Sequence, residues 1–251
     1  MMNFIPSCDS REDAIRSLSL IYCVSIEKIE ETLQDEEIFQ FNEPYRDCNS
    51  DAFQFLLSRK LTARNDIKNA CFYHSTSYDG NSSWFDDGLL GSSQGVNTFI
   101  EKISHLLSQE KLKLAKQQAQ RVVMMRSEDE GFTAATTGPY AWSTYSAASK
   151  SEDGIRYRVP EAISDLWYGS EYVAGGLVNL TDVIERNLKP VVVKFKGKIS
   201  NFDSHCAMLW AYVYSGSDEC EIAQTFHGNG SAIPREDILE LMDVSYAPNL
   251  R

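Results

Sequence analysis

A short apolar run that ends in hydroxyl side chains constrains this chain more than any other feature. Residues 70–77 read Ala-Cys-Phe-Tyr-His-Ser-Thr-Ser, a pattern that predicts a short buried strand. Residues 84–88 read Trp-Phe-Asp-Asp-Gly, which predicts one helical turn closed by glycine. A histidine at such a strand end can hold a polar ligand, because backbone and hydroxyl donors follow it directly. The alternative for His74 is a histidine whose hydrogen bonds are satisfied within the core.

A second segment extends this pattern. Residues 138–151 read Gly-Pro-Tyr-Ala-Trp-Ser-Thr-Tyr-Ser-Ala-Ala-Ser-Lys-Ser. Together with His74-Ser75-Thr76 they resemble two motifs of the diphtheria-toxin-like ADP-ribosyltransferases, the superfamily that includes the poly(ADP-ribose) polymerases. In that superfamily a strand carrying His-Gly-(Ser/Thr) is followed by Gly-x-Tyr, matched here by Gly138-x-Tyr140. A helix start like Ser149-Lys150-Ser151 completes the second motif, and the resemblance covers about residues 68–245.

The resemblance implies a split β-sheet core that binds NAD as a co-substrate and needs no metal. It assigns His74 to the ribose on the adenosine side of NAD and Tyr140 to stacking on the nicotinamide ring. Ser75 stands where the family usually has glycine, and its backbone would contact the nicotinamide amide. Thr76 and Ser149 belong to the matched motifs, so they are also assigned to NAD binding.

The third motif of the superfamily is a glutamate that opens a late strand, and Glu221 in residues 221–226 is its best match. A carboxylate below the ribose stabilises the positive charge of an oxocarbenium-like transition state and can orient or deprotonate the acceptor. Glu219 lies two residues earlier, on the same face of a strand. It is an acceptor-selecting residue, as in the arginine-modifying relatives, or a solvated strand end. A two-residue shift of the alignment makes Glu219 itself catalytic.

Composition excludes several classes of protein. The chain has 251 residues, of which 43% are hydrophobic, and a net charge of −12 from 24 basic and 36 acidic residues. This charge argues against non-specific nucleic-acid binding, but an enzyme that contacts a few nucleotides is compatible with it. No apolar run reaches the roughly 20 residues that span a bilayer, and the first residues lack a secretion signal. We therefore expect a cytoplasmic protein that has no contact with membranes.

The six cysteines are scattered without a Cys-x-x-Cys pair, so they predict free thiols rather than a zinc site or a disulfide framework. Cys71 and Cys206 are expected to be buried. His205 and Cys206 are not expected to form a nucleophile–base pair, because neighbouring residues on a strand point to opposite faces.

The chain is expected to divide near residue 65, with an N-terminal helical extension over residues 1–65 and a catalytic domain over residues 66–251. Ser10 and Ser25 predict the starts of two helices. The extension is acidic and carries none of the matched motifs. Two roles are open for it: it docks an antitoxin-like protein that restrains the enzyme, or it packs on the sheet and completes the core.

Elsewhere the pattern predicts a mixed α+β fold. A long helix is expected from Asn97 to about Val123, and strands at 191–195, 208–214 and 221–226. No glycine-rich phosphate loop follows a strand, so a Rossmann or P-loop fold is not supported.

The residues leave three functions open. The first is a mono-ADP-ribosyltransferase that modifies a nucleic-acid base as a bacterial toxin or phage-defence effector. The second is the same enzyme acting on a protein, with Glu219 selecting the acceptor. The third is a binding module that keeps the fold without turnover.

Overall fold

The computed structural model describes most of the chain, and the part that it describes is a mixed α+β structure, as predicted. The described residues are 4–39, 50–62, 65–129, 138–149, 159, 161–164, 166, 178–215 and 225–244. The chain forms two compact units. Unit 1 consists of residues 1–73, 141–148 and 194–226, and unit 2 of residues 74–140, 149–193 and 227–251. None of the described helices is both long and apolar enough to cross a membrane.

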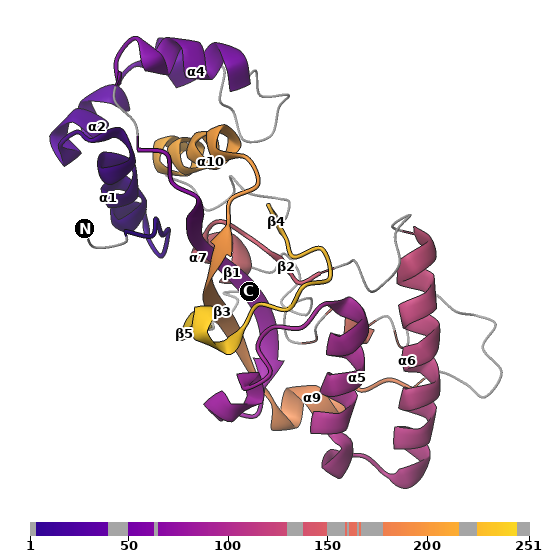
Figure 1. Ribbon diagram of the computed structural model, residues 1–251. Helices are drawn as coiled ribbons and strands as arrows, with labels where there is room; N and C mark the ends of the chain where they lie inside the picture. The colour runs from indigo at the N-terminus through magenta and orange to yellow at the C-terminus, as the bar shows by residue number, and fades with distance from the viewer. Residues whose placement is uncertain are drawn as a thin grey trace, which may run out of the picture. The chain divides into compact units, whose positions relative to one another are not determined.

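Unit 1 is largely helical. Its helices are α1 (Arg11–Tyr22), α2 (Ile26–Thr32), α3 (Glu36–Phe39), α4 (Ser50–Ser58) and α10 (Phe202–Ser215). The side chains of Ser10 and Ser25 accept hydrogen bonds from the N–H groups of Asp13 and Lys28, so both predicted helix starts are confirmed. Helix α1 packs against α2 and α10, and α4 packs against α10 (Figure 1). Helix α4 also packs against α3.

The strand predicted at residues 208–214 is wrong, because this segment lies within helix α10. Most of the helix is buried, from His205 to Val213. A helix that is enclosed on all sides is apolar all round, and its sequence then has no helical period to separate it from a buried strand. The premise used for His205 and Cys206 was therefore also wrong, since the two lie on a helix. Cys71 and Cys206 are buried, as expected.

Three strands form the larger sheet in the order β1-β3-β5, with β1 at Asn69–Tyr78, β3 at Lys189–Lys198 and β5 at Ile238–Asp243. Strands β1 and β3 confirm that strands exist around His74 and at 191–195. The expected position of His74 at a strand end is wrong, because β1 continues to Tyr78 and His74 lies in its middle. The N–H of Ile199, just after β3, donates to the carbonyl of Lys68, just before β1, so these two strands run antiparallel. A smaller pair is formed by β2 (Tyr140–Ala141) and β4 (Phe226–His227).

Unit 2 contains a helical hairpin in place of the single helix predicted from Asn97 to Val123. Helix α5 (Ser92–Lys102) ends, a 3₁₀ turn η2 (Ser104–Leu106) follows, and α6 (Gln109–Asp129) begins. The Ser108 hydroxyl accepts the N–H of Lys111 and so caps the start of α6. The prediction missed this break because the apolar positions continue through it.

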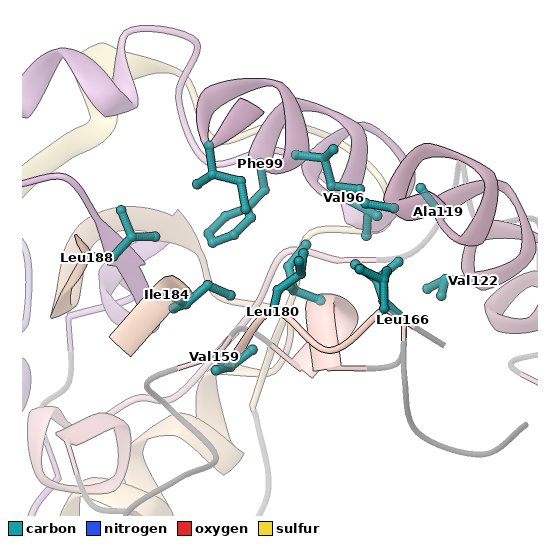
Figure 2. Close-up of a cluster of buried hydrophobic side chains, with 14 residues drawn as sticks. Val96, Phe99, Ala119, Val122, Val159, Leu166, Leu180, Ile184 and Leu188 are labelled. Carbon is teal, nitrogen blue, oxygen red and sulfur yellow. The ribbon is translucent and has the colours of Figure 1, made fainter. Parts of the chain in front are cut away.

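An apolar core joins this hairpin to the rest of unit 2. Figure 2 shows Val96 and Phe99 of α5 and Ala119 and Val122 of α6. The same cluster contains the buried side chains of Val159, Leu166, Leu180, Ile184 and Leu188. The described residues also form the short elements η1 (Ser82–Phe85), α7 (Tyr145–Ser149), α8 (Glu161–Ser164), α9 (Thr181–Asn187) and η4 (Arg235–Asp237). The turn predicted before Gly88 is confirmed by η1.

The N-terminal segment of unit 1 is hydrogen-bonded to strand β1. The N–H of Cys71 donates to the Pro6 carbonyl at 2.7 Å, and the N–H of Cys8 donates to the Tyr73 hydroxyl at 2.8 Å. That hydroxyl in turn donates to Asp9 Oδ1 at 2.6 Å, while Lys194 Nζ lies 2.5 Å from Asp9 Oδ2. These contacts favour the second role considered for residues 1–65, completion of the core. The division at residue 65 and the docking of a partner stay predictions.

An aromatic cluster holds the centre of unit 1. The rings of Phe72 and Phe226 are 4.8 Å apart, those of Phe195 and Phe226 are 5.1 Å apart, and His205 lies 5.9 Å from Phe72. A Cβ atom on Gly197 would lie 2.7 Å from both Phe72 and Phe226. The absence of a side chain at this position therefore lets the two rings meet.

We predict that Gly197→Ala lowers the thermal unfolding temperature. The added methyl group overpacks the Phe72–Phe226 contact, and overpacking typically costs about 1–3 kcal/mol. Gly95→Ala is the matched control: it lies within α5, where an added Cβ would meet nothing closer than 3.5 Å. Since alanine is the better helix former, the control should unfold at the same or a higher temperature. A Gly197→Ala protein as stable as the wild type would contradict this account of the cluster.

A second prediction concerns His205. Burial lowers the pKa of His205 to about 4, and its Nε2 has no hydrogen-bond partner among the described residues. An unfolded chain has a histidine pKa of about 6.5, so it binds more protons than the folded chain below that pH, and stability falls as pH decreases from about 6.5 to 4. At pH 5 the loss from this residue is about 2 kcal/mol.

Urea unfolding of the wild type and of His205→Phe at pH 7.5 and pH 5 measures this contribution. The variant should lose less stability than the wild type between the two pH values, by about 2 kcal/mol. His105→Phe, at an exposed histidine, controls for loss of an imidazole, and should show the wild-type pH dependence. Equal losses in all three proteins would refute a neutral, buried His205.

Candidate functional site

His74 and Tyr140, 66 positions apart in the sequence, meet in unit 2. The Nδ1 atom of His74 lies 2.7 Å from the backbone carbonyl oxygen of Tyr140. A carbonyl oxygen can only accept, so Nδ1 carries the proton and donates it. In the neutral ring Nε2 is then an acceptor, and it has no hydrogen-bond partner in the described part of the chain.

In strand β1, the side chains of His74 and Ser75 are partly exposed to solvent. Residues 70–73 and 76–78 are buried, whereas these two are half-buried. His74 and Thr76 share one face of the strand and Ser75 lies on the other, but Thr76 is only 8% exposed. Of the side chains assigned from the first motif, His74 and Ser75 are therefore the accessible ones.

The electrostatic surroundings keep the His74 ring uncharged. Burial lowers the pKa of His74 below its ordinary value, while the hydrogen bond to Tyr140 acts in the opposite direction with a smaller effect. A neutral imidazole with a protonated Nδ1 and a free Nε2 lone pair can accept a hydrogen bond from a hydroxyl group such as that of a ribose.

Tyr140 is held by its own backbone neighbours. Gly138 has φ +63°, a conformation that glycine adopts readily, and a Cβ there would lie 2.9 Å from Ser92 Oγ. The Tyr140 ring, which is half-buried, packs edge-on against the ring of His227, with 5.2 Å between centroids and 88° between planes. His227 is therefore a further residue of the candidate site, which the sequence analysis did not predict.

Sequence reasoning missed His227, although one signal was available. It follows Phe226 and precedes the Gly228-Asn229-Gly230 turn, so it is a histidine at the end of a short strand, as His74 was expected to be. Its pairing with Tyr140 depends on a contact between distant segments, which no local pattern contains.

Of the remaining residues assigned to the site, the structure describes only some. Ser149 is the half-buried last residue of α7, which begins at Tyr145, so the helix start expected at Ser149 is wrong. Lys150 and Ser151, like Glu219 and Glu221, lie outside the described residues. Thr225, four positions after Glu221 in the sequence, donates its N–H to the carbonyl of Ala141. The roles of the two glutamates stay predictions.

Within the described residues, no group of three or more His, Cys, Asp or Glu side chains is arranged to hold a metal ion. Comparison of the chain with protein-family models, with curated proteins and with solved structures found no match.

We predict that His74 is neutral at pH 7 with its proton on Nδ1. Long-range ¹H–¹⁵N correlation spectra of the imidazole rings distinguish the two neutral tautomers, and His74→Gln identifies the signal by its loss. The signal should show a protonated Nδ1 and should titrate below the ordinary histidine pKa of about 6.5, because burial disfavours the charged ring. A proton found on Nε2 at pH 7 would contradict the hydrogen bond to Tyr140.

Proposed function

We propose that this protein is a mono-ADP-ribosyltransferase that takes ADP-ribose from NAD and attaches it to a nucleic-acid base. The proposal includes an ADP-ribosyltransferase-like core and a role as a toxin or phage-defence effector. The observation that carries it is the hydrogen bond between His74 and the backbone of Tyr140. This bond unites the two residues that the resemblance assigns independently to NAD, one for the ribose and one for the nicotinamide ring.

The proposed chemistry follows from the side chains. The neutral His74 accepts a hydrogen bond from the ribose on the adenosine side, and Tyr140 offers a ring for nicotinamide to stack on. The bond between nicotinamide and C1′ of its ribose breaks, nicotinamide leaves with the bonding electron pair, and C1′ gains positive charge. Glu221 stabilises this charge and takes the proton of the acceptor as the acceptor forms its bond to C1′.

A nucleic-acid base is the acceptor that we favour. Arginine-modifying relatives begin with an arginine where this chain has His74, so the first motif speaks against arginine as the acceptor. The net charge of −12 argues against non-specific nucleic-acid binding but is compatible with contact to a few nucleotides. The alternative is a protein acceptor selected by Glu219, and labelling distinguishes it from a nucleic-acid acceptor.

The test is incorporation of NAD labelled in its adenosine half into cell extract, followed by digestion with nuclease or with protease. Label that nuclease releases supports the proposal, and label that only protease releases moves the acceptor to protein. If the wild type neither transfers label nor hydrolyses NAD, the proposed function fails and the binding module remains.

We predict that Glu221→Gln abolishes transfer without lowering the unfolding temperature. The amide keeps the shape of the side chain but removes its charge, which typically costs about 3 kcal/mol or more, roughly 100-fold or more in rate. Glu240→Gln, at an exposed position of β5, is the matched control and should stay active. An active Glu221→Gln beside an inactive Glu219→Gln would shift the catalytic role by two residues. Activity in both variants would reject the resemblance itself.

A further inference from the structure

His227 occupies a position that the proposed function does not use. It is the last residue of β4, its side chain is exposed, and its ring stands at 88° to the ring of Tyr140 with 5.2 Å between the centroids. Neither imidazole nitrogen forms a hydrogen bond within the described part of the chain. One donor and one acceptor therefore remain on a ring that is already positioned.

The backbone, rather than the side chains alone, holds the two rings together. The N–H of Gly228 donates to the Pro139 carbonyl at 2.9 Å, and the N–H of Gly230 donates to the Gly138 carbonyl at 2.7 Å. The approach is so close that a Cβ on Gly228 would lie 2.5 Å from Pro139 Cδ and 2.8 Å from the Gly138 oxygen. The segment that carries His227 is thus fixed directly on the segment that carries Tyr140.

Tyr140 is consequently held from two directions within unit 2, since its carbonyl accepts from His74 and its ring meets His227. A planar ligand ring that stacks on Tyr140 would lie within reach of the His227 imidazole. The ligand that suits this pair is an aromatic ring bearing an amide, because the ring can stack and the amide offers both a donor and an acceptor. The nicotinamide end of NAD has this chemistry, and the adenosine diphosphate ribose end lacks the amide.

We propose that His227 is a substrate-contacting residue that hydrogen-bonds the carboxamide of the nicotinamide ring stacked on Tyr140. The inference rests on the proposed function, in that it takes NAD as the ligand of this site. It assigns His227 to the half of NAD that leaves in the reaction, whereas His74 serves the half that is transferred. His227 therefore distinguishes NAD from ligands that end at the ribose.

Calorimetric titration with two probes tests the assignment. One probe is carba-NAD, which retains the nicotinamide ring but cannot be cleaved, and the other is ADP-ribose, which lacks that ring. His227→Ala should weaken carba-NAD binding about five- to tenfold, the usual effect of losing one hydrogen bond, and should leave ADP-ribose binding unchanged. His227→Phe, which keeps a ring against Tyr140, should show the same selective loss. His105→Ala, at an exposed histidine of η2, should bind both probes like the wild type.

Each other outcome has a definite meaning. Equal weakening of both probes would place His227 on the ADP-ribose half, and unchanged binding of both would remove it from the site; either result overturns the proposal. If His227→Phe binds carba-NAD as tightly as the wild type, His227 contributes ring packing and no hydrogen bond, and the proposal is also overturned. If His227→Ala fails to fold, His227→Phe alone decides. A wild type that binds carba-NAD but never cleaves NAD would refute the proposed function and leave the assignment of His227 standing, whereas a wild type that binds neither probe refutes both.

Discussion

The hydrogen bond from His74 to the backbone of Tyr140 is the interaction on which the candidate site depends. Because the partner is a carbonyl oxygen, the bond fixes which nitrogen of the ring carries the proton. Burial lowers the pKa of the same ring and keeps it neutral. Together these two effects leave an uncharged acceptor on a strand whose residues on either side of His74 and Ser75 are buried. An arginine or lysine at this position could donate but could not accept.

Strand register keeps His74 in place. The N–H and carbonyl of Tyr73 both pair with Trp142, at 2.9 and 3.0 Å, and its side-chain hydroxyl accepts from Cys8 and donates to Asp9. Burial and the bond to Asp9 both raise the pKa of the Tyr73 hydroxyl, so it stays protonated and remains a donor. Neighbouring strand residues point to opposite faces, so a slip by one residue would exchange this fully buried tyrosine with His74. The many contacts of Tyr73 make that exchange costly.

Local signals predicted the parts of the fold that local chemistry determines. Strands β1 and β3 and the helix starts at Ser10 and Ser25 could be found because a polar cap or a β-branched run marks each of them. The hydrophobic pattern gave wrong predictions where tertiary packing determines the secondary structure. The enclosed helix α10 has no polar face to reveal its period, and the apolar positions of α5 and α6 run on through the turn that separates the two helices. Glu219 and Glu221 lie outside the described residues, so their roles rest on the resemblance alone.

The candidate site shows why residue types identify a site better than they predict its geometry. The motifs selected His74 and Tyr140, yet the two are joined by a backbone carbonyl, which every residue possesses and which no sequence pattern can mark. Tyr140 therefore makes two separate contacts, one through its backbone and one through its ring. Its carbonyl orients His74 and survives replacement of the side chain, whereas its ring contacts His227 and is lost with that replacement. A phenylalanine at position 140 would keep both contacts, while an alanine would keep the orientation of His74 and remove the ring that contacts His227.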